Sequence, residues 1–206
     1  MSGADWKPVE NREGGGRRRV NLIREIDEEM YKKIMDNRTV EEAEAEKTAQ
    51  TVGLAAIKYG DLSNQASKDY IFDVDRFTSF EGNTGPYILY TIVRIKSILN
   101  KYQENGGSLD GLKVRSAENS YEKALMLQVL KFNDVFEAVY EETAPHKLCA
   151  YIYELANEFN KFYHETKILS EEDEEKRAGY IALLVLAKRV LEKCIDLLGF
   201  EAPERM

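Results

Sequence analysis

Histidine and cysteine are scarce in this 206-residue sequence, which has only two of each. His146 and His164 fall near the ends of expected helices, and neither has an acidic or serine partner at a fixed spacing. Cys149 and Cys194 lie in apolar helical patterns without the spacing of metal ligands. A phosphate-loop motif and a nucleophile elbow are also missing. We therefore expect no catalytic residue, no metal site, and two buried free thiols in a reducing cytosol.

Long hydrophobic segments are missing as well. The longest apolar run, IALLVLA at 181–187, is much shorter than the roughly 20 residues that span a bilayer. The opening stretch MSGADWKPVENREGGG contains no apolar region of the kind that a secretory signal needs. These two absences predict no membrane partner and a cytoplasmic location.

Positive charge is in deficit, with 29 Lys and Arg against 37 Asp and Glu and a net charge of −8. General nucleic-acid binders tend to be basic because phosphate contacts dominate their nonspecific affinity, so DNA is not an expected partner. The acids are, however, concentrated in EEAEAE (41–46) and EEDEE (171–175), where carboxylates at helix starts complement the helix dipole. A local basic patch elsewhere on the surface is compatible with this composition.

Helical periodicity is abundant by contrast, and the sequence is 43% hydrophobic, enough to form a core. Asn21, the pair Thr39 and Glu42, and the pair Ser170 and Asp173 are the expected helix caps. The apolar spacing predicts helices over about 21–35, 42–60, 86–101, 120–142, 145–162 and 173–198. Residues 61–83 have no helical period and form an expected connector. The predicted fold class is all-α, a helical bundle with an irregular N-terminal extension over residues 1–20.

The loop REGGGRRR (12–19) in that extension has two interpretations. Its three glycines and four arginines suit an approach to phosphate by backbone amides and guanidinium groups. They are equally typical of a flexible turn with a solvated run of charge. The residues alone do not decide between these interpretations.

The stretch FEGNTGPYILYTIVRIKSILNKY (80–102) places two rows of side chains on one predicted helix, which Pro86 begins. At about 100° per residue the first row is apolar and faces the core. It consists of Ile88, Ile92, Ile95 and Leu99. The second row, about 60° wide, lies beside it. It consists of Tyr87, Tyr90, Arg94 and Lys101.

The second row also has two interpretations. Tyrosines beside a core are usually boundary residues, half-buried with a hydrated hydroxyl group. Alternatively, the rings form a platform on which unpaired bases stack, while Arg94 and Lys101 meet phosphates or base edges. Stacking contributes roughly 1–3 kcal/mol per base, so two tyrosines and an arginine could bind a single strand.

Longer stretches of the sequence resemble one family. The segment KYGDLSNQASKDYIFDVDRFTSFEGNTGPYILYTIVRIKSIL resembles the junction into the anticodon-binding domain of arginyl-tRNA synthetases, and EGNTGPYxxYxxxR is its most specific part. PHKLCAYIYELANEFNKFY and the terminal LLGFEAPERM are similar to later parts of that domain. Upstream, MSGADWKPVENREGGG is similar to the loop GKDGKPFKTREGG that ends the family's catalytic domain. The resemblance covers nearly the whole chain.

The resemblance implies a role for specific residues. In this family the helical C-terminal domain binds the anticodon loop of arginine tRNA. By the motif match, Tyr87, Tyr90 and Arg94 line the anticodon pocket, and Met206 packs at the same site. Tyr163, in FNKFY, is carried over to the RNA-binding set. The implied partners are the anticodon stem-loop of arginine tRNA and the missing catalytic domain, and ATP belongs to the parent enzyme, with no cofactor bound by this chain.

The sequence departs from the family at its N-terminal end. The signature histidines and the nucleotide fold that precede this region in the family are absent, and Glu10 and Asn11 replace the family's Lys-Thr. We therefore do not expect residues 1–20 to bind ATP. The expected function is the tRNA-binding C-terminal part of an arginine–tRNA ligase, a class I aminoacyl-tRNA synthetase, inactive by itself. The alternatives are a stand-alone RNA-binding module of the same fold without ligase activity, and a helical protein-interaction module.

The expected organisation has three parts. Residues 1–35 correspond to the C-terminal loop and helix of the catalytic domain, residues 36–80 to a long helix and a structured connector, and residues 81–206 to the helical anticodon-binding domain. Leu22, Ile26 and Met30 are expected to pack partly on the missing catalytic domain.

Overall fold

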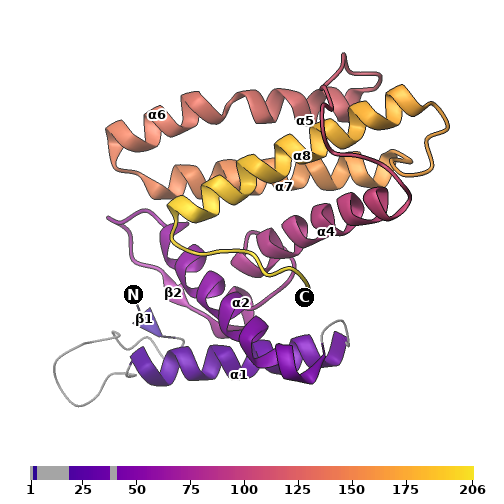
Figure 1. Cartoon of the computed structure of the whole chain (residues 1–206). Coiled ribbons are helices and arrows are strands. Elements are labelled where there is room, and N and C mark those ends of the chain that lie inside the picture. The colour runs from indigo at the N-terminus through magenta and orange to yellow at the C-terminus, as the bar shows by residue number, and fades with distance from the viewer. Residues whose placement is uncertain (1, 4–18, 38–40) are drawn as a thin grey trace.

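The computed structural model describes residues 2–3, 19–37 and 41–206, and within them helices account for most of the fold (Figure 1). The helices are α1 (Arg19–Asn37), α2 (Glu42–Leu62), α3 (Val74–Phe77), α4 (Gly85–Glu104), α5 (Ser120–Leu130), α6 (Phe132–Glu142), α7 (Pro145–Glu165) and α8 (Glu174–Leu197). The predicted all-α class is confirmed. Residues 12–18 of the loop REGGGRRR, the predicted cap Thr39 and most of the predicted N-terminal extension lie outside the described residues, whereas Arg19 is the first residue of α1.

The connector is more regular than its sequence predicts. Residues Ile71–Phe72 form strand β2, which pairs in parallel with β1 (Ser2–Gly3), and α3 follows directly. Asp73 caps α3, because its side chain accepts a hydrogen bond from the Arg76 amide at 3.2 Å. A two-residue strand and a four-residue helix are too short to show a period in the sequence.

Helix α1 lies along one end of the molecule, and α2 leads obliquely from it towards the C-terminal end of α8 (Figure 1). The apolar row of α1 is buried against α2, and its members are Leu22, Ile26, Met30 and Ile34. The expectation that this row packs on a missing catalytic domain was therefore wrong for the described residues. A Cβ atom built at Gly53 of α2 would lie 3.4 Å from a methyl carbon of Ile26, so a residue without a side chain lets the two helices approach closely there.

Helix α4 lies beside α2, between α1 and the layer formed by α5, α6, α7 and α8 (Figure 1). It begins as predicted, because the Thr84 hydroxyl accepts a hydrogen bond from the Tyr87 amide at 3.2 Å and Pro86 occupies the first turn. The predicted core row is confirmed, since all four side chains are at most 3% exposed: Ile88, Ile92, Ile95 and Leu99. The second row is thereby left on the surface.

The predicted helix over 120–142 is wrong as a single element. It breaks at Lys131, whose amide bonds to the Gln128 carbonyl at 3.3 Å, one residue closer than in an α-helix. The tightened turn changes the phase of the apolar residues, so that Leu125 is buried whereas Phe136 is 42% exposed. Among the described residues α6 contains no fully buried side chain, although Phe132, Val135 and Val139 are partly buried against the core.

Of the predictions for the cap of α8 and for the two cysteines, the first was wrong in part and the second is confirmed. Asp173 alone caps α8, accepting a hydrogen bond from the Lys176 amide at 3.0 Å, so the pairing with Ser170 was wrong. The prediction of two buried free thiols is confirmed for Cys149 and Cys194. Burial raises the pKa of each thiol to about 12, which keeps both protonated and unreactive at neutral pH.

Candidate nucleic-acid interface

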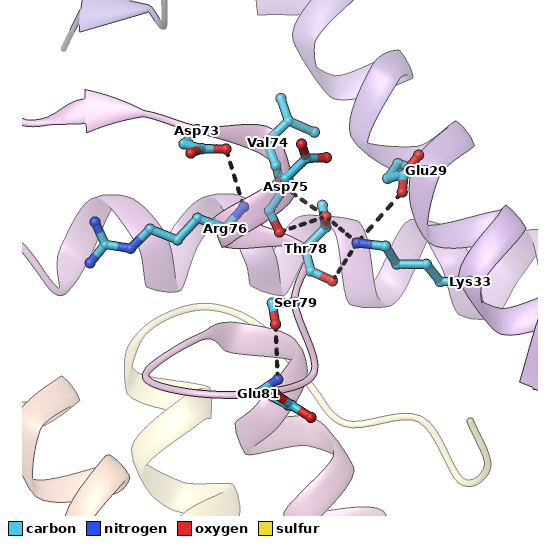
Figure 2. Close-up of polar contacts among 9 residues, drawn as sticks. All are labelled: Glu29, Lys33, Asp73, Val74, Asp75, Arg76, Thr78, Ser79 and Glu81. Atoms are coloured by element: carbon cyan, nitrogen blue, oxygen red, sulfur yellow. Dashed lines mark hydrogen bonds and ion pairs between the residues drawn. The ribbon is translucent and has the colours of Figure 1, made fainter.

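The loop before α4 is anchored to α1 by a lysine. Figure 2 shows Lys33 donating to the Thr78 hydroxyl at 2.8 Å and lying close to the Thr78 carbonyl at 3.3 Å, while Glu29 lies 3.5 Å from the same amine. Thr78 is fully buried, so these bonds satisfy polar groups that water cannot reach. The connector is thereby fixed at the end of α3, a few residues before α4 begins at Gly85.

The same loop supplies two residues of the surface next to α4. The Ser79 hydroxyl accepts a hydrogen bond from the Glu81 amide at 3.1 Å (Figure 2), and the Thr84 hydroxyl donates to the Ser79 carbonyl at 2.6 Å. These bonds shape the turn that carries Phe80 and Glu81. The Phe80 ring lies 6.4 Å from the Tyr90 ring in an edge-on arrangement.

The second row of α4 borders a surface hollow of about 650 Å³. Four of the five residues singled out in the sequence line it: Tyr87, Tyr90, Arg94 and Met206. The remaining lining residues are Ile34, Phe80, Glu81, Asn160 and His164. Tyr90 is 40% exposed and Met206 is 9% exposed, so the ring is accessible while the methionine forms part of the wall. We call this space the Met206 hollow.

The fifth residue, Tyr163, lies on α7 beside Arg94. The Arg94 guanidinium lies 4.7 Å from the centre of the Tyr90 ring and 5.1 Å from that of Tyr163. Such cation–π contacts hold a guanidinium flat against aromatic faces. Tyr90, Arg94 and Tyr163 therefore form one continuous aromatic and cationic surface from two helices.

A second hollow of about 440 Å³ borders the same surface. Tyr90, Arg94, Tyr163 and Lys101 all line it, together with Thr166. Arg94 and Tyr90 line both spaces, so they lie where the two hollows meet. The Thr166 hydroxyl is buried and has no hydrogen-bond partner among the described residues. We call this space the Lys101 hollow.

Two asparagines of α7 connect the second row of α4 to the bundle, and the sequence did not single them out. The Asn160 side chain accepts a hydrogen bond from Arg94 at 2.6 Å and donates to the Tyr87 hydroxyl at 3.0 Å. The Tyr87 hydroxyl in turn donates to Asn157 at 2.8 Å. The only available signal was two amide side chains three residues apart beside the core face of α7.

These hydrogen bonds orient the side chains of Tyr87 and Arg94, and the surroundings of Tyr87 determine the protonation state of its hydroxyl group. Burial raises the pKa of Tyr87, although its bond to Asn160 and the nearby Arg94 act in the opposite direction. The hydroxyl is therefore protonated at neutral pH and can donate to Asn157. Arg94 uses one of its five donor groups on Asn160, which leaves others for a ligand. Tyr87 is thus a supporting residue, whereas Tyr90 and Arg94 face the open space.

This arrangement suits unpaired nucleic-acid bases. Exposed tyrosine rings offer stacking surfaces, and a guanidinium that is already oriented offers donors to base edges or phosphates. Lys101 adds a second cation to the lining of the Lys101 hollow, whereas Glu81 makes the Met206 hollow less favourable for phosphate. In the ranges that the structure describes, no cluster of potential metal ligands occurs and no helix has the length and apolar character needed to cross a membrane.

Comparisons with known proteins agree on one family. Residues 88–206 match the family model described as DALR anticodon binding domain, which is more than half of the chain. Residues 1–74 match a second model, described as tRNA synthetases class I (R), catalytic domain. The boundary between the two matched ranges falls in the segment that leads into α4.

Individual relatives give the same result. The chain is 64% identical to an arginine–tRNA ligase of Agathobacter rectalis and 50% identical to that of Alkaliphilus oremlandii, in each case over its whole length. It spans 36% and 35% of those proteins, about a third of each. Among solved structures, the arginyl-tRNA synthetase of Thermus thermophilus matches 96% of the chain at 28% identity with a TM-score of 0.84, and the match covers 34% of that structure.

Proposed function

The chain belongs to the family of DALR anticodon binding domains, in the form found in arginyl-tRNA synthetases, and from this premise we propose that it binds the anticodon loop of arginine tRNA. The bound tRNA would serve the ATP-dependent joining of arginine to tRNA by a full-length arginine–tRNA ligase. The main observation behind this proposal is the surface formed by Tyr90, Arg94 and Tyr163 at the junction of the two hollows. This aromatic and cationic surface occurs on a protein whose net charge is −8.

The proposed roles of the site residues follow from their exposure and contacts. Tyr90 and Tyr163, at 40% and 38% exposed, provide rings for stacking. Arg94 binds a base edge or a phosphate from its position between the rings. Tyr87 and Met206 form the walls of the Met206 hollow. Two hollows on either side of Arg94 suit two unpaired bases held apart by the guanidinium.

We further propose that the remaining partners lie outside this chain. ATP would act in the rest of the ligase, and the described residues supply no cluster suited to a metal. Residues 1–35, 36–80 and 81–206 would be the end of the catalytic domain, a linking helix with its connector, and the anticodon-binding domain. The location would be the cytoplasm, where tRNA is charged.

A binding titration tests the proposal. We expect the chain to bind arginine tRNA at least about tenfold more tightly than a tRNA with a changed anticodon, which corresponds to about 1.4 kcal/mol. Repeating the titration at two salt concentrations counts phosphate contacts, since the slope of log K against log salt reports the counterions released. Equal affinity for both tRNAs at each salt concentration would contradict anticodon recognition by this surface.

A further inference from the structure

The segment after α8 returns across the molecule towards α4 (Figure 1), and its last residue, Met206, lines the Met206 hollow. Gly199 makes the reversal with a φ of +80°, a left-handed conformation that favours glycine. The Lys58 amine of α2 donates a hydrogen bond to the Gly199 carbonyl. Phe200 and Met206, near the two ends of this segment, are 5% and 9% exposed. We call residues 199–206 the C-terminal strap.

Lys96 of α4 bonds to two residues near the end of the strap, Pro203 and Glu204. The Lys96 amine lies 2.6 Å from a carboxylate oxygen of Glu204 and 3.4 Å from the carbonyl of Pro203. Its side chain is only 12% exposed, and a carboxylate oxygen of Glu192 on α8 lies 3.8 Å away. Lys96 is therefore a largely buried cation whose two shortest contacts are both to the strap. The Glu204 side chain is 80% exposed, so burial in this pair is confined to the lysine side.

The position of Met206 depends on these contacts by simple chain geometry. Met206 follows Glu204 by two residues, so its Cα lies within about 7 Å of the Cα of Glu204. Residues 201–206 form neither helix nor strand, so no ladder of backbone hydrogen bonds determines their path. The bonds from Lys96 are thus the polar contacts nearest to Met206 in the strap. Without them, the methionine that forms part of the hollow's wall has only its own apolar packing to hold it.

We infer that Lys96 is a positioning residue for the candidate site. Its bonds to Pro203 and Glu204 hold Met206 in the wall of the Met206 hollow. Because the RNA-binding part of this inference rests on the proposed function, it has a structural and a functional consequence. Lys96 does not contact RNA, since its amine is engaged with the strap and Glu192. It acts on RNA through Met206.

The structural consequence is testable without RNA. Methyl-labelled methionine gives one nuclear magnetic resonance signal for Met206, which the variant Met206→Ala assigns. In Lys96→Met, which keeps the length of the side chain but removes the charge, we expect this signal to move towards the shift and narrow linewidth of an unfolded methionine. Lys96→Arg is expected to retain the native signal. An unchanged Met206 signal in Lys96→Met would overturn the inference.

A matched control separates this effect from a general loss of charge. Lys188 on α8 lies 3.0 Å from Glu192, the same carboxylate that Lys96 approaches, but makes no bond to the strap. The variant Lys188→Met is expected to leave the Met206 signal unchanged. If Lys188→Met and Lys96→Met release Met206 equally, the carboxylate of Glu192 and not the strap is the important partner, and the inference is wrong.

The functional consequence is measured with the anticodon stem-loop of arginine tRNA. Lys96→Met is expected to weaken binding by roughly tenfold in the wild-type background and by less than twofold in a Met206→Ala background, since the two changes remove the same contact. Equal losses in both backgrounds would show that Lys96 acts directly on RNA and would overturn the inference. If the wild-type chain itself showed no preference for this stem-loop, the proposed function would fail, and the nuclear magnetic resonance result would still decide whether Lys96 seats Met206.

Discussion

A chain carrying Gly85→Ala is expected to unfold at a clearly lower urea concentration than the wild type, with a loss of about 3 kcal/mol in the free energy of unfolding. Gly85 is the first residue of α4 and is buried where this helix meets α2. A Cβ atom added there would lie 2.3 Å from the carbonyl oxygen of Ala55 and 2.6 Å from its carbonyl carbon. Both are backbone atoms of a helix, which cannot rotate away as a side chain can, so the two helices would have to separate.

Gly53→Ala is the matched control, because the atom it would meet is of a different kind. A Cβ at Gly53 would lie 2.4 Å from a carboxylate oxygen of Asp27, the far end of a side chain on α1 that can move aside. Alanine also favours a helix interior over glycine by about 1 kcal/mol, which offsets the cost of that movement. We expect the stability of Gly53→Ala to stay within about 1 kcal/mol of the wild type. Equal stability of Gly85→Ala would contradict the close approach of α4 to α2.

Tyr90→Ala is expected to weaken binding of the anticodon stem-loop by roughly 1–3 kcal/mol, between about 5-fold and 150-fold in the dissociation constant. The Tyr90 ring is exposed at the junction of the two hollows, and it lies against the Arg94 guanidinium that it helps to orient. Fluorescence anisotropy at two salt concentrations measures the loss. The loss should depend little on salt, because a stacking contact releases no counterions.

Tyr121→Ala provides a tyrosine of equal exposure away from the site. Tyr121 lies on α5 and is 40% exposed, as Tyr90 is, so both variants remove the same ring from a similar surface. We expect Tyr121→Ala to leave RNA affinity unchanged. Neither variant should unfold the protein, since Tyr90 lies off the core row of α4. If Tyr90→Ala instead melted the bundle and left the affinity of the folded fraction unchanged, Tyr90 would be a boundary residue of the core with no role in RNA binding.

Local signals in the sequence were sufficient to predict α4 and its two rows. Pro86 and Thr84 determine where the helix begins, and four residues at helical spacing determine which face is buried. The break at Lys131 could not be predicted in the same way. Its neighbours continue a helical pattern, and the tightened turn depends on how α5 and α6 each pack on α7.

Part of the site could also be predicted from local signals in the sequence. Tyr87, Tyr90 and Arg94 share one helix, so their relative placement follows from spacing alone. Asn160 joins that row from α7, more than sixty residues later, and Lys96 reaches the strap across more than a hundred residues. Hydrogen bonds between distant segments leave no periodic trace in a sequence. Their residues look like ordinary polar positions until the helices are placed side by side.

Photochemical cross-linking tests most directly whether unpaired bases contact the surface of Tyr90, Arg94 and Tyr163. The reagent is the arginine anticodon stem-loop with 5-iodouridine placed in turn at each unpaired position of the loop, and mass spectrometry identifies the cross-linked peptides. We expect cross-links in the peptides that contain Tyr90 and Tyr163, and their loss when an unlabelled stem-loop competes. Tyr140 on α6 is a demanding internal control, because at 80% exposed it is far more accessible than either site tyrosine. Cross-links confined to Tyr140 or to α1, with none on α4 or α7, would contradict the proposed site.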